Sequence, residues 1–240
     1  MILRSFYLSC LLSLVSTSAL LAQTAKPAKP AAPSPFTVQE RIYQKALSLN
    51  DLETATGAVH TMIALRPDLV NWNDTLCLLY HGRSMFAQSW ALSSELLKRR
   101  PDDLTFIEIH AQALEGLGQY AEAIKDYEVL VNKVPQPVFR YKAAALQYLL
   151  KRFGECDANL NFLISNNAID KEKVSLQGED GAVQSVPLRA AVYNIKGILA
   201  MDLNKPEDAE SAFTEALRLF PEFVMARVNR ERLHQPSPTK

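Results

Sequence analysis

The stretch that decides the fold is GQYAEAIKDYEVLVNKVP, residues 118–135. It places the small side chain of Ala123 three residues after Tyr120 and four residues before Tyr127, and it ends in a proline. Side chains at this spacing lie on one face of a helix, and proline stops a helix because it lacks an amide hydrogen. The stretch therefore predicts an amphipathic helix that ends before Pro135.

The same pattern recurs along the chain. Prolines follow one another at intervals of 34 residues, and a small side chain stands twelve positions before each of them. When the copies are aligned, the prolines form one column, Pro67, Pro101 and Pro135. The small side chains form a second column, Ala55, Ser89 and Ala123. Further copies place Cys156 and Ala209 in the small column, after steps of 33 and 53 residues. Self-similarity at such a period indicates stacked helical hairpins, so we expect five of them in one array.

The columns resemble the tetratricopeptide repeat (TPR), a unit of two antiparallel helices in about 34 residues. The third copy is the most similar, and the fifth supplies Gly197, Ala209, Phe213, Ala216 and Pro221. The resemblance implies an all-α, right-handed superhelical solenoid of about five hairpins over residues 36–234. It also implies that the first helix of each hairpin lines a concave face that binds a peptide or protein segment.

Counting along the first helices gives the candidate partner-binding residues. They are Glu40, Gln44, Asp74, Leu78, His81, Glu108, Gln112, Glu115, Asn194 and Ile198. The fourth copy is ambiguous by one residue and offers either Tyr141 and Tyr148 or Lys142 and Leu149. This mixed apolar and acidic set suits an extended or helical segment with basic and apolar side chains. A solvated face without a ligand is the alternative.

The long step before the fifth copy is explained by an insertion at about residues 168–187. Apolar and polar residues alternate over 173–177, a turn sequence follows at 178–181, and 182–186 contains Val183 and Val186. This pattern predicts a β-hairpin. Two interpretations of its role stay open: a tolerated surface loop, or an open strand edge that binds a partner.

Both ends of the chain carry segments of their own. A positive Arg4, an apolar stretch and small residues up to Ala22 predict a signal peptide over 1–22. Serines interrupt the apolar run, which disfavours a membrane anchor, and Cys10 lies too early for lipid attachment. Residues 23–35 are a linker of mainly Ala, Pro and Lys. A capping helix over 222–234 and a tail over 235–240 are expected at the other end.

Composition and charge disfavour other classes of function. The chain has 26 basic and 26 acidic residues, so it lacks the basic footprint of a nucleic-acid or anionic-lipid binder. Its four histidines lack metal-site spacing, and no glycine-rich phosphate loop occurs. We expect no cofactor, no metal, no catalytic residue and no stable membrane insertion. The two cysteines that remain after signal cleavage, Cys77 and Cys156, are expected to pack without a disulfide.

These observations favour a non-catalytic scaffold or adaptor that binds another protein. Export with a linker favours the periplasm or cell envelope of a bacterium, with outright secretion as the alternative. An accessory subunit that regulates an envelope enzyme or secretion complex is the second hypothesis. An enzyme with an unrecognised site is the third.

Overall fold

The computed structural model describes residues 32–178 and 181–235. The chain divides into the units Met1–Ser34 and Pro35–Lys240, and the fold below is that of the second unit. The expected signal peptide, most of the linker and the tail beyond residue 235 lie outside the described residues. Among those that are described, no helix combines the length and the apolar character needed to cross a membrane.

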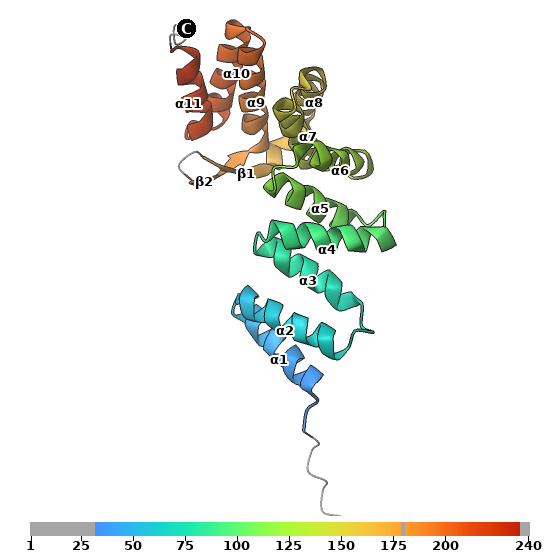
Figure 1. Ribbon diagram of the computed structural model, residues 1–240. Helices are drawn as coiled ribbons and strands as arrows, with labels where there is room; N and C mark the ends of the chain where they lie inside the picture. Colours follow the sequence, from blue (N-terminus) through green and yellow to red (C-terminus); the bar gives the residue numbers. More distant parts are fainter. Residues whose placement is uncertain (1–31, 179–180, 236–240) are drawn as a thin grey trace, which may run out of the picture. The chain divides into compact units, whose positions relative to one another are not determined.

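Within these residues the chain forms eleven α-helices, one 3-10 helix and one β-hairpin (Figure 1). In chain order they are α1 (Pro35–Ser48), α2 (Leu52–Leu65), α3 (Asn71–Gly82), α4 (Phe86–Arg99), α5 (Leu104–Gly116), α6 (Tyr120–Lys133), α7 (Pro137–Leu149), α8 (Phe153–Ser165), η1 (Asn167–Lys171), β1 (Lys173–Gln177), β2 (Val183–Pro187), α9 (Leu188–Asp202), α10 (Pro206–Leu219) and α11 (Val224–Leu233). The first ten α-helices pair in order as hairpins, which confirms the solenoid with one inserted β-hairpin.

A left-handed residue closes the first helix of every hairpin. Asn50, Ser84, Gly118, Lys151 and Asn204 have positive φ, and they follow one another at 34, 34, 33 and 53 residues. The amide of the next residue bonds back to the last helical turn each time, as in Asp51 N to Ala46 O at 2.9 Å. This arrangement satisfies the free carbonyls of a helix end and turns the chain back on itself. The spacings of 33 and 53 residues in the sequence repeat therefore recur in the spacing of these turns.

The repeating columns form the core. The small column, which contains Ala55, Ser89, Ala123, Cys156 and Ala209, is 0% exposed throughout. The column four residues later is equally buried and contains Val59, Ser93, Tyr127, Leu160 and Phe213. Small side chains let the two helices of a hairpin approach closely, and large ones fill the space between hairpins.

The inserted hairpin is part of the core on one of its faces. Val174 of β1 pairs with Val186 of β2, and both are buried with Phe223 from the loop before α11. The side-chain amide of Gln184 donates to the carbonyl of Glu222 at 2.8 Å, and its oxygen accepts from the amide of Val224 at 3.1 Å. The hairpin therefore fixes the start of α11. It is more than a tolerated surface loop.

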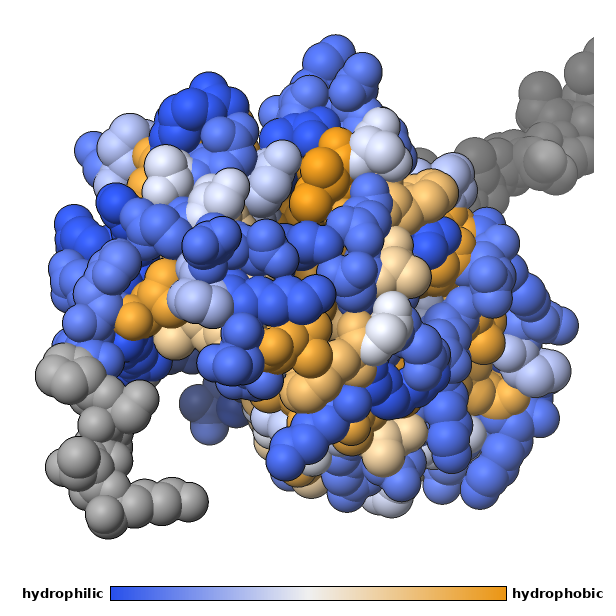
Figure 2. Space-filling model, turned by 90° about the horizontal axis from the view of Figure 1, so that it is seen from above, coloured by the Kyte–Doolittle hydropathy of each residue, from blue (hydrophilic) through white to orange (hydrophobic). Residues whose placement is uncertain are grey.

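The last helix, α11, packs on α9 and α10, and it starts at Val224, two residues after the start of the predicted capping helix. Arg230 and His234 both bind the carboxylate of Glu210 on α10, which ties the two helices together. Figure 2 looks onto the end of the unit formed by α9, α10 and α11, where hydrophilic side chains cover most of the surface. A polar outer face at a terminal repeat keeps the stack from growing by addition of further copies.

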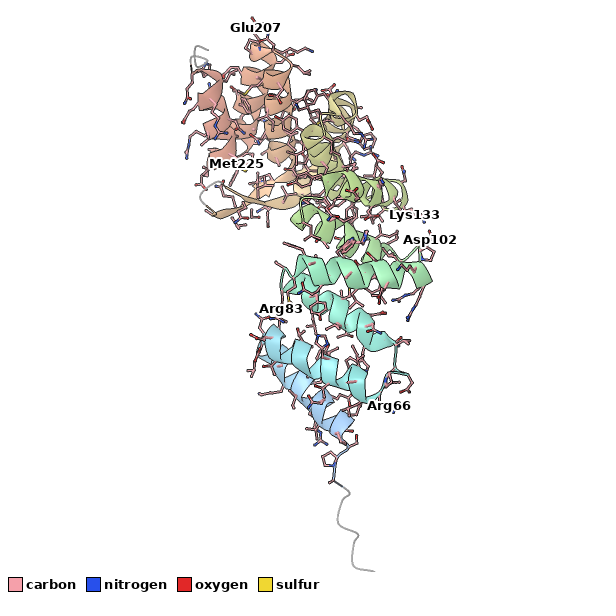
Figure 3. The ribbon with its side chains drawn as sticks, viewed as in Figure 1. Arg66, Arg83, Asp102, Lys133, Glu207 and Met225 are labelled. Carbon is pink, nitrogen blue, oxygen red and sulfur yellow. The ribbon has the colours of Figure 1, made fainter. Side chains whose placement is uncertain are left out.

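Ion pairs join successive hairpins at the edge of the stack. Lys133 at the end of α6 binds Asp102 in the loop between α4 and α5, with Nζ and Oδ1 2.5 Å apart. Figure 3 shows this pair and Arg66 on one side of the ribbon, and Arg83 on the other. Arg83 follows a first helix, whereas Arg66 and Asp102 follow second helices and Lys133 ends one. The two kinds of connection thus occupy opposite edges of the stack.

Candidate protein-binding surface

The first helices of the hairpins lie on the inner side of the stack. Helix α3 contacts α5, α7 contacts α9, and α9 contacts α11, so alternate helices meet across successive hairpins. Helices of neighbouring repeats approach each other most closely on the inner side of a curved stack. These contacts place α3 beside α5 and α7 beside α9, and Lys142 of α7 reaches Glu115 of α5. We call the side of the stack formed by the first helices, α1 included, the inner face.

The part of the inner face formed by α1 and α3 is open. Glu40 and Gln44 on α1 are exposed, and Leu78 on α3 is 49% exposed. His81, one turn further along α3, is half-buried, and its Nδ1 is buried without a hydrogen-bond partner. The exposed leucine offers apolar contact to a bound segment.

Asp74 is already engaged within the chain. Its Oδ1 accepts a 2.7 Å bond from Nη2 of Arg100, which follows α4, and this bond raises the pKa of Arg100. The guanidinium also stands 4.9 Å from the centre of the Phe106 ring on α5. The carboxylate therefore helps to join three consecutive helices, and its charge is balanced before a partner arrives.

Glu115 is engaged in the same way, while its neighbours on α5 are not. It accepts from the hydroxyl of Tyr127 and from Nζ of Lys142 on α7, both at 2.8 Å. Burial raises the pKa of Tyr127, and the Glu115 carboxylate adds to this. Glu108 and Gln112 bond only within α5, at 2.8 Å, and both are half-buried. The inner face is thus less acidic than its composition suggests.

The register of the fourth hairpin follows from these contacts. Tyr141 is 5% exposed and packs in the core, whereas Lys142 reaches Glu115 and Leu149 is 53% exposed. Tyr148 is half-buried, and its hydroxyl donates to Asp202 on α9 at 2.7 Å. Of the two alternatives, Lys142 and Leu149 are the pair that the open surface presents.

The last two candidates lie under the capping helix. Asn194 is 4% exposed, and its Oδ1 accepts from Nδ2 of Asn229 on α11 at 3.0 Å. Ile198 packs in a cluster with Phe213 and Leu233. Helix α11 occupies the place that the first helix of another repeat would take. The candidates on α1 and α3 therefore include exposed side chains, those on α5 are half-buried, and those on α9 lie against α11.

A chain of hydrogen bonds that sequence reasoning missed links three helices. Asp126 on α6 bonds Nδ1 of His110 on α5 at 2.6 Å, and Nε2 bonds Oγ of Ser94 on α4 at 3.0 Å. The order resembles that of a serine-hydrolase triad. However, Oγ of Ser94 also donates to the carbonyl of Trp90 at 2.7 Å. Ser94 lies inside a helix, where backbone amides are already bonded and cannot hold an oxyanion.

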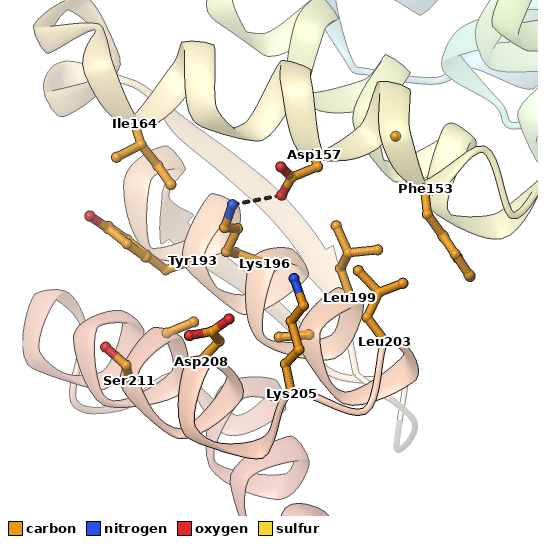
Figure 4. A pocket seen from close by; sticks show the side chains of 13 residues that line it. Phe153, Asp157, Ile164, Tyr193, Lys196, Leu199, Leu203, Lys205, Asp208 and Ser211 are labelled. Carbon is orange, nitrogen blue, oxygen red and sulfur yellow. Dashed lines mark hydrogen bonds and ion pairs between the residues drawn. The ribbon is translucent and has the colours of Figure 1, made fainter.

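A cleft of about 640 Å³ opens between α8, α9 and α10 (Figure 4). Apolar side chains such as Phe153, Leu199 and Leu203 line it together with charged groups. Lys196 crosses it to Asp157 at 2.6 Å, the interaction drawn in Figure 4, and Lys205 and Asp208 add one charge of each sign. Its cations are therefore matched by nearby carboxylates.

Both cysteine side chains are buried in the core. Cys77 and Cys156 are 0% exposed and free, and burial raises the pKa of each to about 12. A thiol with so high a pKa is a poor nucleophile at neutral pH. Among the described residues, no group of three or more His, Cys, Asp or Glu side chains is placed to hold a metal ion.

Comparisons with known proteins agree with this architecture. Residues 196–230 match the tetratricopeptide repeat, and no curated protein matches the chain in sequence. YrrB, described as a TPR protein with an unusual peptide-binding site, has a TM-score of 0.63 at 12% identity, over 83% of this chain and 100% of that one. MamA from residue 41 onward, from Desulfovibrio magneticus RS-1, has a TM-score of 0.62 at 12% identity, over 81% and 99%. Residues 196–230 thus match a tetratricopeptide repeat, and the chain as a whole has the fold of tetratricopeptide repeat proteins.

Proposed function

We propose that the protein is a non-catalytic adaptor of the bacterial cell envelope that binds a segment of another protein on its inner face. The observation that carries this proposal is the open part of the inner face on α1 and α3, where Glu40, Gln44 and Leu78 are exposed. Peptide binding by the structurally similar YrrB supports the same use of this fold.

The chemistry of the inner face narrows the kind of segment that fits. Leu78 offers apolar contact, while Glu40 and the half-buried Glu108 supply negative charge. Asp74 and Glu115 contribute little, because Arg100 and Lys142 balance them. A segment with an apolar side chain opposite Leu78 and basic groups on either side would be complementary.

Localisation is the part of the proposal that rests on the amino-terminal sequence. The apolar stretch and the small residues before Gln23 support export, and the linker supports a spacer between the cell envelope and the array. Expression of the full chain with a carboxy-terminal tag, followed by cell fractionation and sequencing of the mature amino terminus, tests it. Recovery of uncleaved protein from the cytosol would contradict the proposal.

The binding proposal is tested by capture with a matched pair of variants. Leu78→Glu with Glu108→Lys changes the inner face without touching the pairs of Asp74 and Glu115. Lys125→Glu changes an exposed side chain of α6 and serves as the control. We expect proteins cross-linked to the unaltered chain and to the control to be lost from the double variant. Equal recovery by all three would show that the inner face is not the binding surface.

A further inference from the structure

The α1 end of the stack leaves an apolar stripe uncovered. Val38, Ile42 and Leu49 are 39%, 37% and 65% exposed, and together with Ala46 they line a cleft of about 390 Å³ against the turn into α2. Their spacing puts them on one side of the helix. This stripe, which we call the α1 face, is distinct from Glu40 and Gln44 on the inner face.

Positive charge borders the α1 face. Arg41 and Lys45, one helical turn apart, line the same cleft and are exposed. The acidic side chain in the lining, Asp51, accepts a bond from the amide of Thr54 at 3.0 Å and so caps α2. That bond lowers the pKa of Asp51, because it stabilises the charged carboxylate. The cleft thus presents apolar surface with two cations and one carboxylate, a net positive charge.

The segments of this chain outside the described residues do not match the α1 face. Residues 1–31 and 236–240 contain no Asp or Glu, while Arg4, Lys26, Lys29 and Lys240 are basic. Residues 23–33 consist of small side chains, prolines, lysines and a glutamine, which cannot cover a stripe of Val, Ile and Leu. Charge therefore argues against a cover from within the chain.

A second copy of the chain fits no better. Packing α1 against another α1 would bring Arg41 and Lys45 next to their own counterparts. Packing it against α11 of another copy would oppose these cations to a helix with three arginines and one glutamate. Like charges across an interface are unfavourable. What remains complementary is an apolar helix with acidic borders.

We infer that the α1 face docks an amphipathic helix of another protein, whose apolar stripe is flanked by Asp or Glu. Such a helix inserts apolar side chains at intervals of three and four residues between Val38, Ile42 and Leu49. Its carboxylates then lie against Arg41 and Lys45. The docked helix takes the place of the second helix that a preceding repeat would supply, and it continues the stack with a foreign element.

The test uses the full chain and two synthetic helical peptides. Both carry leucines every three or four residues, flanked by glutamate in one peptide and by lysine in the other. Fluorescence anisotropy measures their affinity for the unaltered chain, for Arg41→Glu with Lys45→Glu, and for a control with Lys98→Glu and Arg99→Glu on exposed α4 positions. Circular dichroism verifies that all three proteins are folded, and sedimentation measures their oligomeric state.

We expect the acidic peptide to bind the unaltered chain and the control, and to bind the α1 variant about tenfold more weakly, because two charge pairs become repulsions. The lysine peptide should show the opposite preference. Failure of the acidic peptide to bind the unaltered chain, equal binding of both peptides, or binding unaffected by the α1 variant would each overturn the inference. A dimer that dissociates in the α1 variant would overturn it in favour of a second copy.

Discussion

The two ends of the array differ in how the apolar outer face of the terminal repeat is covered. At the carboxy-terminal end, α11 and the inserted hairpin bury Phe223, Val186 and Ala226 to 0% exposure. At the amino-terminal end, α1 packs on α2 and leaves Val38 and Leu49 partly exposed. A repeat cannot cover its own outer face, so each end needs an added element or a partner. The chain supplies that element at one end only, within the residues that the structure describes.

The first prediction compares how much apolar burial at each end contributes to the free energy of unfolding. Phe223→Ala removes a fully buried ring that packs with β2, α9 and α11, and we expect it to lower the free energy of unfolding by about 3–5 kcal/mol. Ile42→Ala, at the open end, should cost less than about 1 kcal/mol because its side chain is 37% exposed. Urea unfolding followed by circular dichroism gives both values. Equal losses would show that the α1 face is covered in the free protein.

The second prediction compares two glycines, one from each half. A Cβ on Gly197 of α9 would lie 2.4 Å from the Phe213 ring of α10, whereas a Cβ on Gly57 of α2 would meet nothing within 4 Å. Gly197→Ala should therefore cost about 1–3 kcal/mol through overpacking. Gly57→Ala should raise stability by up to about 1 kcal/mol, since alanine favours the helix. Thermal unfolding measures both, and a stabilising Gly197→Ala would contradict the close packing of this hairpin.

The repeat columns could be predicted from the sequence because each hairpin buries the same positions whatever its neighbours do. The β-hairpin was predictable for a similar reason, since its alternation is local. The state of Asp74, Glu115 and Asn194 was not, because it depends on contacts between hairpins. Lys142 reaches Glu115 from the first helix of the next hairpin, and Asn229 reaches Asn194 from α11. Sequence periodicity contains no information about such pairings.

The third prediction addresses how the closed end is held. Gln184→Ala removes the bonds to the carbonyl of Glu222 and to the amide of Val224, which should cost about 1–2 kcal/mol and free the start of α11. Hydrogen exchange at the Val224 amide should speed up more than exchange within α9. Gln177→Ala is the matched control, because its exposed side chain bonds only within the hairpin, to the carbonyl of Gly181 at 3.3 Å. If both variants exchange alike, the hairpin does not fix the capping helix.

The smallest expected effect concerns the first half of the array, where the repeat pattern is broken by a hydroxyl. Ser89 is 0% exposed, and its Oγ has no hydrogen-bond partner among the described residues, whereas the matching Ala209 has no polar side-chain atom to satisfy. Because an unpaired buried hydroxyl is costly, Ser89→Ala should stabilise the protein by about 1 kcal/mol. Ser93→Ala should not, since Oγ of Ser93 donates to the carbonyl of Trp90 at 3.1 Å. Chemical unfolding separates the two outcomes, and a loss of stability in Ser89→Ala would mean that this hydroxyl has a partner in solution. A gain would show that the sequence of the first half of the array keeps its stability below what the same fold can reach.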